Sequence, residues 1–217
     1  MFTDKNLQDN VMAELNWEPR VNAAHIGVTA KAGVVTLSGH VETYSEKNAA
    51  EDAAWRIKGV KGMAQEIEVR LPNSIKHTDE QIAEAALSRL SWDVTVPKDS
   101  TSVKVQDGWI TLTGEVEWQY EKMDAEYDVA RILGVTGVSN QMTLRPRVNT
   151  TDISNGIRTA LHRSWFFDPD TITVKADGGK VKLSGTANSW HDREVASRTA
   201  WAAKGATSVQ NDITVTN

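Results

Sequence analysis

The residues that could carry out catalysis occur in this chain without any catalytic spacing. No cysteine is present, which excludes a thiolate nucleophile, a disulfide and a cysteine-ligated metal site. No serine lies in a nucleophile elbow, and no glycine-rich phosphate loop precedes a helix. The five histidines lack the HExxH spacing that places two zinc ligands on one helix face; they are His25, His40, His77, His162 and His191. We therefore expect a protein that is not an enzyme and that holds no metal or other cofactor.

Two weaker signals for acid–base chemistry have simpler explanations. Asp124, Glu126 and Asp128 cluster on one expected helix, where paired carboxylates could act as general acid and base. On an exposed helix face such residues are far more often solvated charges, and this is what we predict for them. His191 and Asp192 form a loose pair at the start of another expected helix, and we predict a capping or surface role for them.

The best candidate for a binding surface combines aromatic and basic side chains. Trp165, Phe166 and Phe167 follow one another directly, close to Arg158 and Arg163. Aromatic rings beside arginines suit a membrane interface, where the ring lies among the headgroups and the cation meets anionic lipid. The same side chains also suit a contact between modules or between copies of the chain, which is the more common use of exposed aromatics.

The charge of the chain argues against broad binding of nucleic acid or of anionic membranes. The net charge is −5, and the segments 1–72, 73–148 and 149–217 carry −2, −4 and +1. Residues 59–62 and 134–137 spell the GxxG of KH domains, in which this loop clamps phosphates between two helices. Here the glycines lie between a helix and a strand, so helix termination explains them better and nucleic-acid binding is not expected.

The chain repeats itself three times, and this repeat defines the unit that must position all these residues. Gly39, Gly114 and Gly185 each end a run of alternating branched residues, at intervals of 75 and 71 residues. The same offsets align apolar residues and further glycines, which indicates a module of roughly 65 residues. We predict modules at 3–70, 78–145 and 149–216. A small domain used three times is more often a binding module than an enzyme.

Each module is predicted to fold in the order α-β-β-α-β, which makes the chain an α+β protein with two helices covering a three-stranded sheet. Apolar residues at helical spacing mark the first helix, and alternating strands around a glycine-containing turn follow it. Thr78 with Gln81 forms a capping box before the second copy, and Thr151 or Asp152 can cap the third. The predicted stripes of the first helices are Leu7, Val11 and Leu15; Ile82, Ala86 and Leu90; and Ile153, Ile157 and Leu161.

Several further positions recur in all three copies. Gly39 and its equivalents mark a bend, or a backbone that approaches the helix too closely for a Cβ atom. A second set of glycines suits the C′ position after the second helix; it is Gly59, Gly134 and Gly205. A basic residue near the start of that helix could bind an anion or pair with neighbouring acids; it is Lys47, Lys122 or Arg193. Tryptophans share a register after the first helix (Trp17, Trp92) and within the second (Trp55, Trp201).

These features together resemble the BON domain family. The residues that carry the resemblance are Val35-Thr36-Leu37-Ser38-Gly39 with its copies, the alanine-rich second helix, and the glycine segment 59–62 that leads to the last strand. The resemblance covers nearly the whole chain. It implies the α-β-β-α-β fold and a non-catalytic role in binding phospholipid surfaces or other envelope partners, often under osmotic or envelope stress.

Two hypotheses for function follow, with a third that is weaker. The first is adhesion to phospholipid through the aromatic and basic residues of module three, and the second is a protein-interaction or self-assembling scaffold. The third is sensing of an ion or small ligand between modules. No segment approaches the run of about 18 apolar residues that spans a bilayer. The chain as given begins without a secretory signal, so we expect a cytoplasmic location, or a periplasmic one if a signal was removed.

Overall fold

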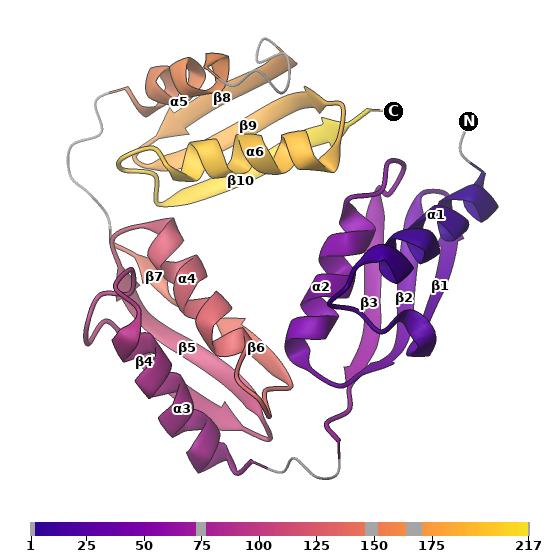
Figure 1. The fold of residues 1–217 in the computed structure, drawn as a ribbon. Helices are drawn as coiled ribbons and strands as arrows, with labels where there is room; N and C mark the ends of the chain where they lie inside the picture. Colours follow the sequence, from indigo (N-terminus) through magenta and orange to yellow (C-terminus); the bar gives the residue numbers. More distant parts are fainter. Residues whose placement is uncertain (1–2, 73–76, 146–151, 164–170, 217) are drawn as a thin grey trace. The chain divides into compact units, whose positions relative to one another are not determined.

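The computed structural model describes residues 3–72, 77–145, 152–163 and 171–216 of the 217 in the chain. We keep the names module 1, module 2 and module 3 for the predicted segments 3–70, 78–145 and 149–216. Each contains one sheet and two helices, and Figure 1 shows both helices of each module on the same side of its sheet. The predicted α+β class and the order α-β-β-α-β are confirmed.

Module 1 shows the arrangement most completely. β1 and β2 form an antiparallel hairpin, and β3 returns parallel to β2 after the crossover through α2. A two-residue turn, Ala32-Gly33, joins the hairpin with positive φ at both residues, as a type I′ turn requires. The elements are α1 (Asp4–Trp17), a short 3-10 helix η1 (Ala23–His25), β1 (Ile26–Lys31), β2 (Val34–Val41), α2 (Tyr44–Trp55) and β3 (Gly62–Val69).

Modules 2 and 3 repeat this topology with one difference. In module 2 the last strand is interrupted at Gln141 and Met142, where Asn140 Oδ1 accepts the backbone N–H of Met142. Module 2 therefore has two short strands in place of the single last strand that we predicted. Its elements are α3 (Asp79–Trp92), β4 (Thr101–Gln106), β5 (Trp109–Val116), α4 (Gln119–Ala130), β6 (Gly137–Asn140) and β7 (Thr143–Leu144). Those of module 3 are α5 (Ile153–His162), β8 (Ile172–Asp177), β9 (Lys180–Ala187), α6 (Trp190–Trp201) and β10 (Ser208–Val215).

The core of each module lies between its helices and one face of its sheet. The predicted stripe of the first helix is buried in all three copies, as are the alanines of the second helix that let it lie close to the strands. Along β2, buried residues such as Val35 and Leu37 alternate with more exposed neighbours. The other face of each sheet is thus turned away from the helices, and its side chains do not contribute to the core.

The helix starts are set by side chains that accept backbone N–H groups. Thr78 and Gln81 form the predicted capping box of α3, and Asp152 caps α5. Asp79, in the first turn of α3, also binds the turn between β4 and β5. Its carboxylate accepts the N–H groups of Asp107 and Gly108 at 2.8 and 2.9 Å. Each first helix of modules 1 and 2 is thereby tied to the turn between its first two strands; Asp4 does the same in module 1 by accepting the N–H of Ala32.

The recurrent glycine that we predicted at the end of the second strand lies within that strand, and a close backbone approach requires it there. A Cβ atom on Gly39, Gly114 or Gly185 would overlap the carbonyl oxygen of the residue before the first strand, and all three have positive φ. The close neighbour is therefore the backbone that leads into the first strand, and not one of the two α-helices. The second set of glycines also has positive φ, but α2 ends at Trp55 with Arg56 as its C-cap. Gly59 thus lies three residues beyond the C-cap, after an extra turn, and not at C′.

We predict opposite effects for two glycine substitutions in module 3. Gly185→Ala should lower the free energy of unfolding by about 2 kcal/mol or more, because the new Cβ meets a backbone carbonyl at positive φ. Gly156→Ala should raise it by about 0.5–1 kcal/mol, because Gly156 lies within α5 with open space around it. Hydrogen exchange of the β9 amides in urea measures both changes in module 3 alone. Equal effects of the two substitutions would contradict this account of Gly185.

Candidate binding surface at the ends of the first helices

Two tryptophans at the same register of the repeat extend from modules 1 and 2 into solvent. Trp17 is the last residue of α1 and Trp92 is the last residue of α3. Their exposed fractions are 82% and 84%. Tryptophan is on average a highly buried residue, because its ring carries a large apolar surface. Two such rings held in solvent at one register make these helix ends a candidate binding surface.

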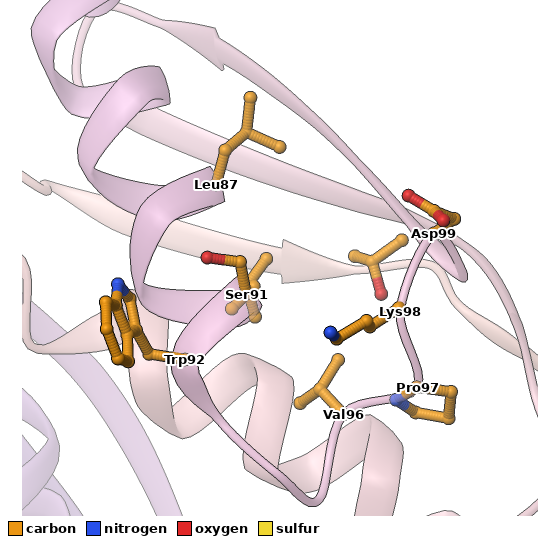
Figure 2. Close-up of a pocket in the computed structure, with 9 residues that line it drawn as sticks. Leu87, Ser91, Trp92, Val96, Pro97, Lys98 and Asp99 are labelled. Atoms are coloured by element: carbon orange, nitrogen blue, oxygen red, sulfur yellow. The ribbon is translucent and has the colours of Figure 1, made fainter.

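Two other exposed apolar residues lie close to Trp92 in the sequence. Leu87 is 52% exposed and Val94 is 98% exposed, so the end of α3 presents three exposed apolar residues. A hollow of about 510 Å³ lies between this helix end and the segment 96–101. Figure 2 shows Trp92 and Ser91 on the helix side of the hollow, with Val96, Pro97 and Lys98 on the segment that faces it.

Module 1 has a hollow on a different side of its exposed ring, between α1 and the segment after α2. Trp17 borders a hollow of about 480 Å³ together with Ala13 of the same helix, Ile57 and Lys58. In both modules a lysine lines the same hollow as the exposed tryptophan: Lys58 in module 1 and Lys98 in module 2. Each helix end therefore combines an exposed ring with a nearby cation.

An acid that directly follows the tryptophan positions the helix end. Glu18 is the C-cap of α1, and its side chain is 8% exposed. It accepts from Arg20 Nε at 2.8 Å and from Arg56 Nη2 at 3.0 Å. Hydrogen bonds from Arg20 and then from Arg56 lower the pKa of Glu18 to about 2. Glu18 thus ties the end of α1 to the loop after it and to the end of α2.

Asp93 occupies the same register in module 2 and is held differently. It accepts from the backbone N–H and the hydroxyl of Thr95, both at 2.7 Å, and these bonds lower the pKa of Asp93. Beside it, Arg89 Nε on α3 donates to Asp128 Oδ1 on α4 at 3.3 Å. Neither acid was identified from the sequence, although Glu18 and Asp93 align at the repeat offset and this alignment is the signal that could have found them.

The prediction that Asp124, Glu126 and Asp128 are solvated charges is wrong for at least one of them. The side chain of Asp128 is 14% exposed, and this burial raises its pKa. Glu126 Oε2 accepts from Asn140 Nδ2 at 3.1 Å. Asp128 lies toward α3 and Glu126 toward the last strand, so their hydrogen bonds connect α4 to other elements of the module.

The lipid-contact residues predicted for module 3 are only partly described. Trp165, Phe166 and Phe167 lie outside the described residues. Arg158 is exposed on α5 and donates to Asn155 Oδ1 at 3.0 Å. Arg163 is the exposed C-cap of α5, at the register that Trp17 and Trp92 occupy in the other modules. Of the predicted residues that are described, Arg163 thus lies at the helix end and Arg158 lies within the helix.

The basic residue that recurs on the second helix has a structural partner. Lys47 Nζ donates to the carbonyl oxygen of Ile67 at 2.7 Å, and Lys122 Nζ donates to that of Met142 at 2.7 Å. Arg193 donates to the carbonyls of Ile213 and Asn211. In each copy the cation binds backbone carbonyls at one place: in the last strand of modules 1 and 3, and in the break between β6 and β7 in module 2. This shared backbone contact explains its recurrence without an anion site or a neighbouring acid.

Two further searches cover only the part of the chain that the structure describes. Within it, no group of three or more histidine, aspartate or glutamate side chains is placed to hold a metal ion. None of its helices has the length and apolar character needed to cross a bilayer.

The anchoring role of Glu18 predicts how stability depends on pH. Folding lowers the pKa of Glu18 from 4.5 to about 2. The contribution of its carboxylate to the free energy of unfolding is therefore fully present above pH 4.5 and is lost as the pH falls toward 2. Glu18→Gln should therefore lower the Tm at pH 7, and the gap to the unmodified protein should shrink between pH 4.5 and 2. Thermal unfolding followed by circular dichroism measures this gap.

Glu68→Gln is the matched control, because the pair that Glu68 forms with Arg70 is exposed on both sides. This variant should change the Tm little at any pH. A gap for Glu18→Gln that stays constant down to pH 2 would show that its carboxylate is not the anchor.

The comparisons with known proteins agree with the repeat. A family model described as BON domain matches residues 3–70, 78–146 and 149–217. The chain is 28% identical over 143 residues to osmotically-inducible protein Y of Escherichia coli (strain K12), covering 64% of this chain and 71% of that protein.

Two solved structures of CdsD, a structural protein of the type III secretion system of Chlamydia trachomatis, are also similar at 15% identity. Their TM-scores are 0.27 and 0.25, with 97% and 100% of this chain and 92% and 100% of those chains covered, and at these scores the likeness carries no conclusion. The three family matches, which together span nearly all of the sequence, show that this chain belongs to the BON domain family.

Proposed function

We propose that this protein is a non-enzymatic adhesion protein that binds phospholipid surfaces through the ends of its first helices. The observation that carries the proposal is the exposure of Trp17 and Trp92, at 82% and 84%, at one register of two modules. Trp165, Phe166 and Phe167 follow the same helix in module 3 and are proposed to act with them. Membership in the BON domain family supports a binding role that requires no catalytic residues.

The energy available from such a contact is large enough to matter. A tryptophan side chain that leaves water entirely removes about 150–250 Å² of surface, which corresponds to an upper limit of about 4–6 kcal/mol. A ring at the level of the headgroups stays partly hydrated, so about 1.4 kcal/mol, or tenfold in affinity, is a conservative expectation for each. Lys58 and Lys98 line the same hollows and can meet lipid phosphates.

The net charge shapes the expected lipid preference. Because modules 1 and 2 are acidic, long-range attraction to an anionic bilayer contributes little to their binding. Binding should therefore depend mainly on the apolar rings and should persist at high salt, with module 3 supplying the part that depends on anionic lipid. The cytoplasmic location expected from the sequence stays a prediction.

A role under osmotic stress is a further part of the proposal. The Escherichia coli relative is named as osmotically inducible, and its match covers 64% of this chain. Adhesion to lipid surfaces is a function that such a stress would call for, because osmotic change alters the tension and packing of a bilayer.

Co-sedimentation with vesicles tests the lipid contact. Wild-type protein should bind vesicles of phosphatidylcholine with phosphatidylglycerol, and the double variant Trp17→Ala, Trp92→Ala should bind at least about tenfold more weakly. Trp109→Val is the matched control, because Trp109 is exposed on the sheet and not at a helix end. Equal binding by the double variant and the wild type, or no binding by either, would remove the proposal.

A second candidate function is self-association through the same surface, because Leu87, Trp92 and Val94 are three exposed apolar side chains in the last part of α3 and just after it. Light scattering over a range of protein concentrations distinguishes self-association from lipid binding. A mass that rises with concentration in the wild type, stays monomeric in the double variant and accompanies an absence of vesicle binding would favour the scaffold.

A further inference from the structure

Besides Trp17 and Trp92 at the helix ends, the described residues include a third exposed tryptophan, Trp109, on the sheet of module 2. Trp109 is the first residue of β5 and is 50% exposed, on the face of the sheet that its helices do not cover. A Cβ atom on Gly137 of β6 would overlap the six-membered part of the Trp109 ring, and Gly137 itself is buried. The ring therefore lies over the Cα of Gly137, in the space that a side chain would fill. One side of the ring covers this strand and the other is open to solvent.

Side chains that can form hydrogen bonds surround the ring. They line a hollow of about 390 Å³, which lies within the range of about 300–1,000 Å³ typical of small-ligand sites. Gln106 lies opposite Trp109 in the β4–β5 ladder, and Lys104 lies opposite Thr111. The side chains that line the hollow with Trp109 are Lys104, Gln106, Asp107, Thr111 and Thr136.

The other two modules show that the fold does not require this arrangement. At the register of Trp109, module 1 has Val34 and module 3 has Lys180. Opposite these residues on the last strand stand Gly62 and Ser208, at the register of Gly137. An aromatic ring over a glycine, within a polar rim, is thus a feature that module 2 adds to the common sheet.

The charges of this hollow decide which ligand suits it. Lys104 and Asp107 give it one charge of each sign, and module 2 as a whole is acidic, which disfavours a nucleotide or another phosphate compound. Lys104 beside the ring also disfavours a quaternary ammonium group, which is recognised by cages of several aromatic rings. The polar rim disfavours a purely apolar chain.

A neutral sugar ring has the complementary chemistry. Its C–H face packs on an aromatic ring, while its hydroxyl groups donate to and accept from side chains such as Gln106, Asp107 and Thr111. We propose that the Trp109 platform of module 2 is a binding site for a neutral saccharide. This site is separate from the helix ends, so it does not depend on the proposed lipid contact.

Titration of the full chain with neutral oligosaccharides tests the site. With maltotriose and N-acetylchitotriose as probes at millimolar concentrations, the Trp109 indole N–H signal in a ¹H–¹⁵N spectrum should shift in a saturable way. Trp109→Val lacks this reporter, so sugar binding to the variant is followed through the backbone amide signals of Thr136 and Gly137, which lie at the same hollow and beneath the ring. Their shift should be abolished or weakened at least about tenfold relative to the wild type, because the ring is removed. This substitution is expected to fold, since Val34 occupies the same register over Gly62 in module 1.

Two further variants make the result specific. Gln106→Ala should weaken the response while it leaves the ring in place, and Trp17→Ala with Trp92→Ala should leave it unchanged. If neither sugar shifts the Trp109 signal, or if adenosine monophosphate shifts it and the sugars do not, the proposal is wrong. Sugar binding that survives in Trp109→Val would also overturn it. Because vesicle binding is measured separately, failure of this site and failure of the lipid contact are distinguishable.

Discussion

The burial of one sheet face beneath two helices is the interaction on which each module depends. A domain of this size buries only about 60% of the surface of its unfolded chain, so almost every large apolar side chain must go to that one interface. The stripe Leu7, Val11 and Leu15 and its equivalents in α3 and α5 meet this demand. Side chains at the helix ends and on the open sheet face are not needed for it. Exposed rings at these places therefore call for a different explanation.

The three copies within one chain help to separate structural residues from functional ones. Lys47, Lys122 and Arg193 recur, and all three donate to backbone carbonyls at equivalent positions of their modules, which shows that their repetition serves the fold. Trp17 and Trp92 recur as well, but the core does not explain their position, because more than four fifths of each side chain is exposed. Repetition alone does not distinguish these two cases, whereas burial and hydrogen bonding do.

Much of the fold could be predicted from the sequence, because its signals are local. The helical stripes, the capping box of Thr78 and the turns between strands all depend on residues a few positions apart. The break in the last strand of module 2 could not be predicted, because module 3 makes the same bond from an asparagine side chain to the backbone within an unbroken β10. The same holds for the burial of Asp128, whose partner Arg89 lies on another helix 39 residues away.

The candidate sites were predicted less well than the fold. The two exposed rings at the helix ends were aligned, but their exposure depends on how α1 and α3 pack and cannot be read from spacing. The contact between Trp109 and Gly137 joins residues 28 positions apart through the parallel pairing of two strands. Nothing in the local sequence of either residue indicates this contact.

The open sheet faces have a consequence for how a repeated protein can diversify. The same scaffold presents His40 in module 1, whose ring stacks on that of His25 in η1, Trp109 in module 2, and the opposed Lys175 and Lys182 in module 3. A substitution there alters no core contact, so it costs little folding energy. Duplication thus supplies several independent surfaces on which recognition can diverge while the hidden side of each copy stays constant.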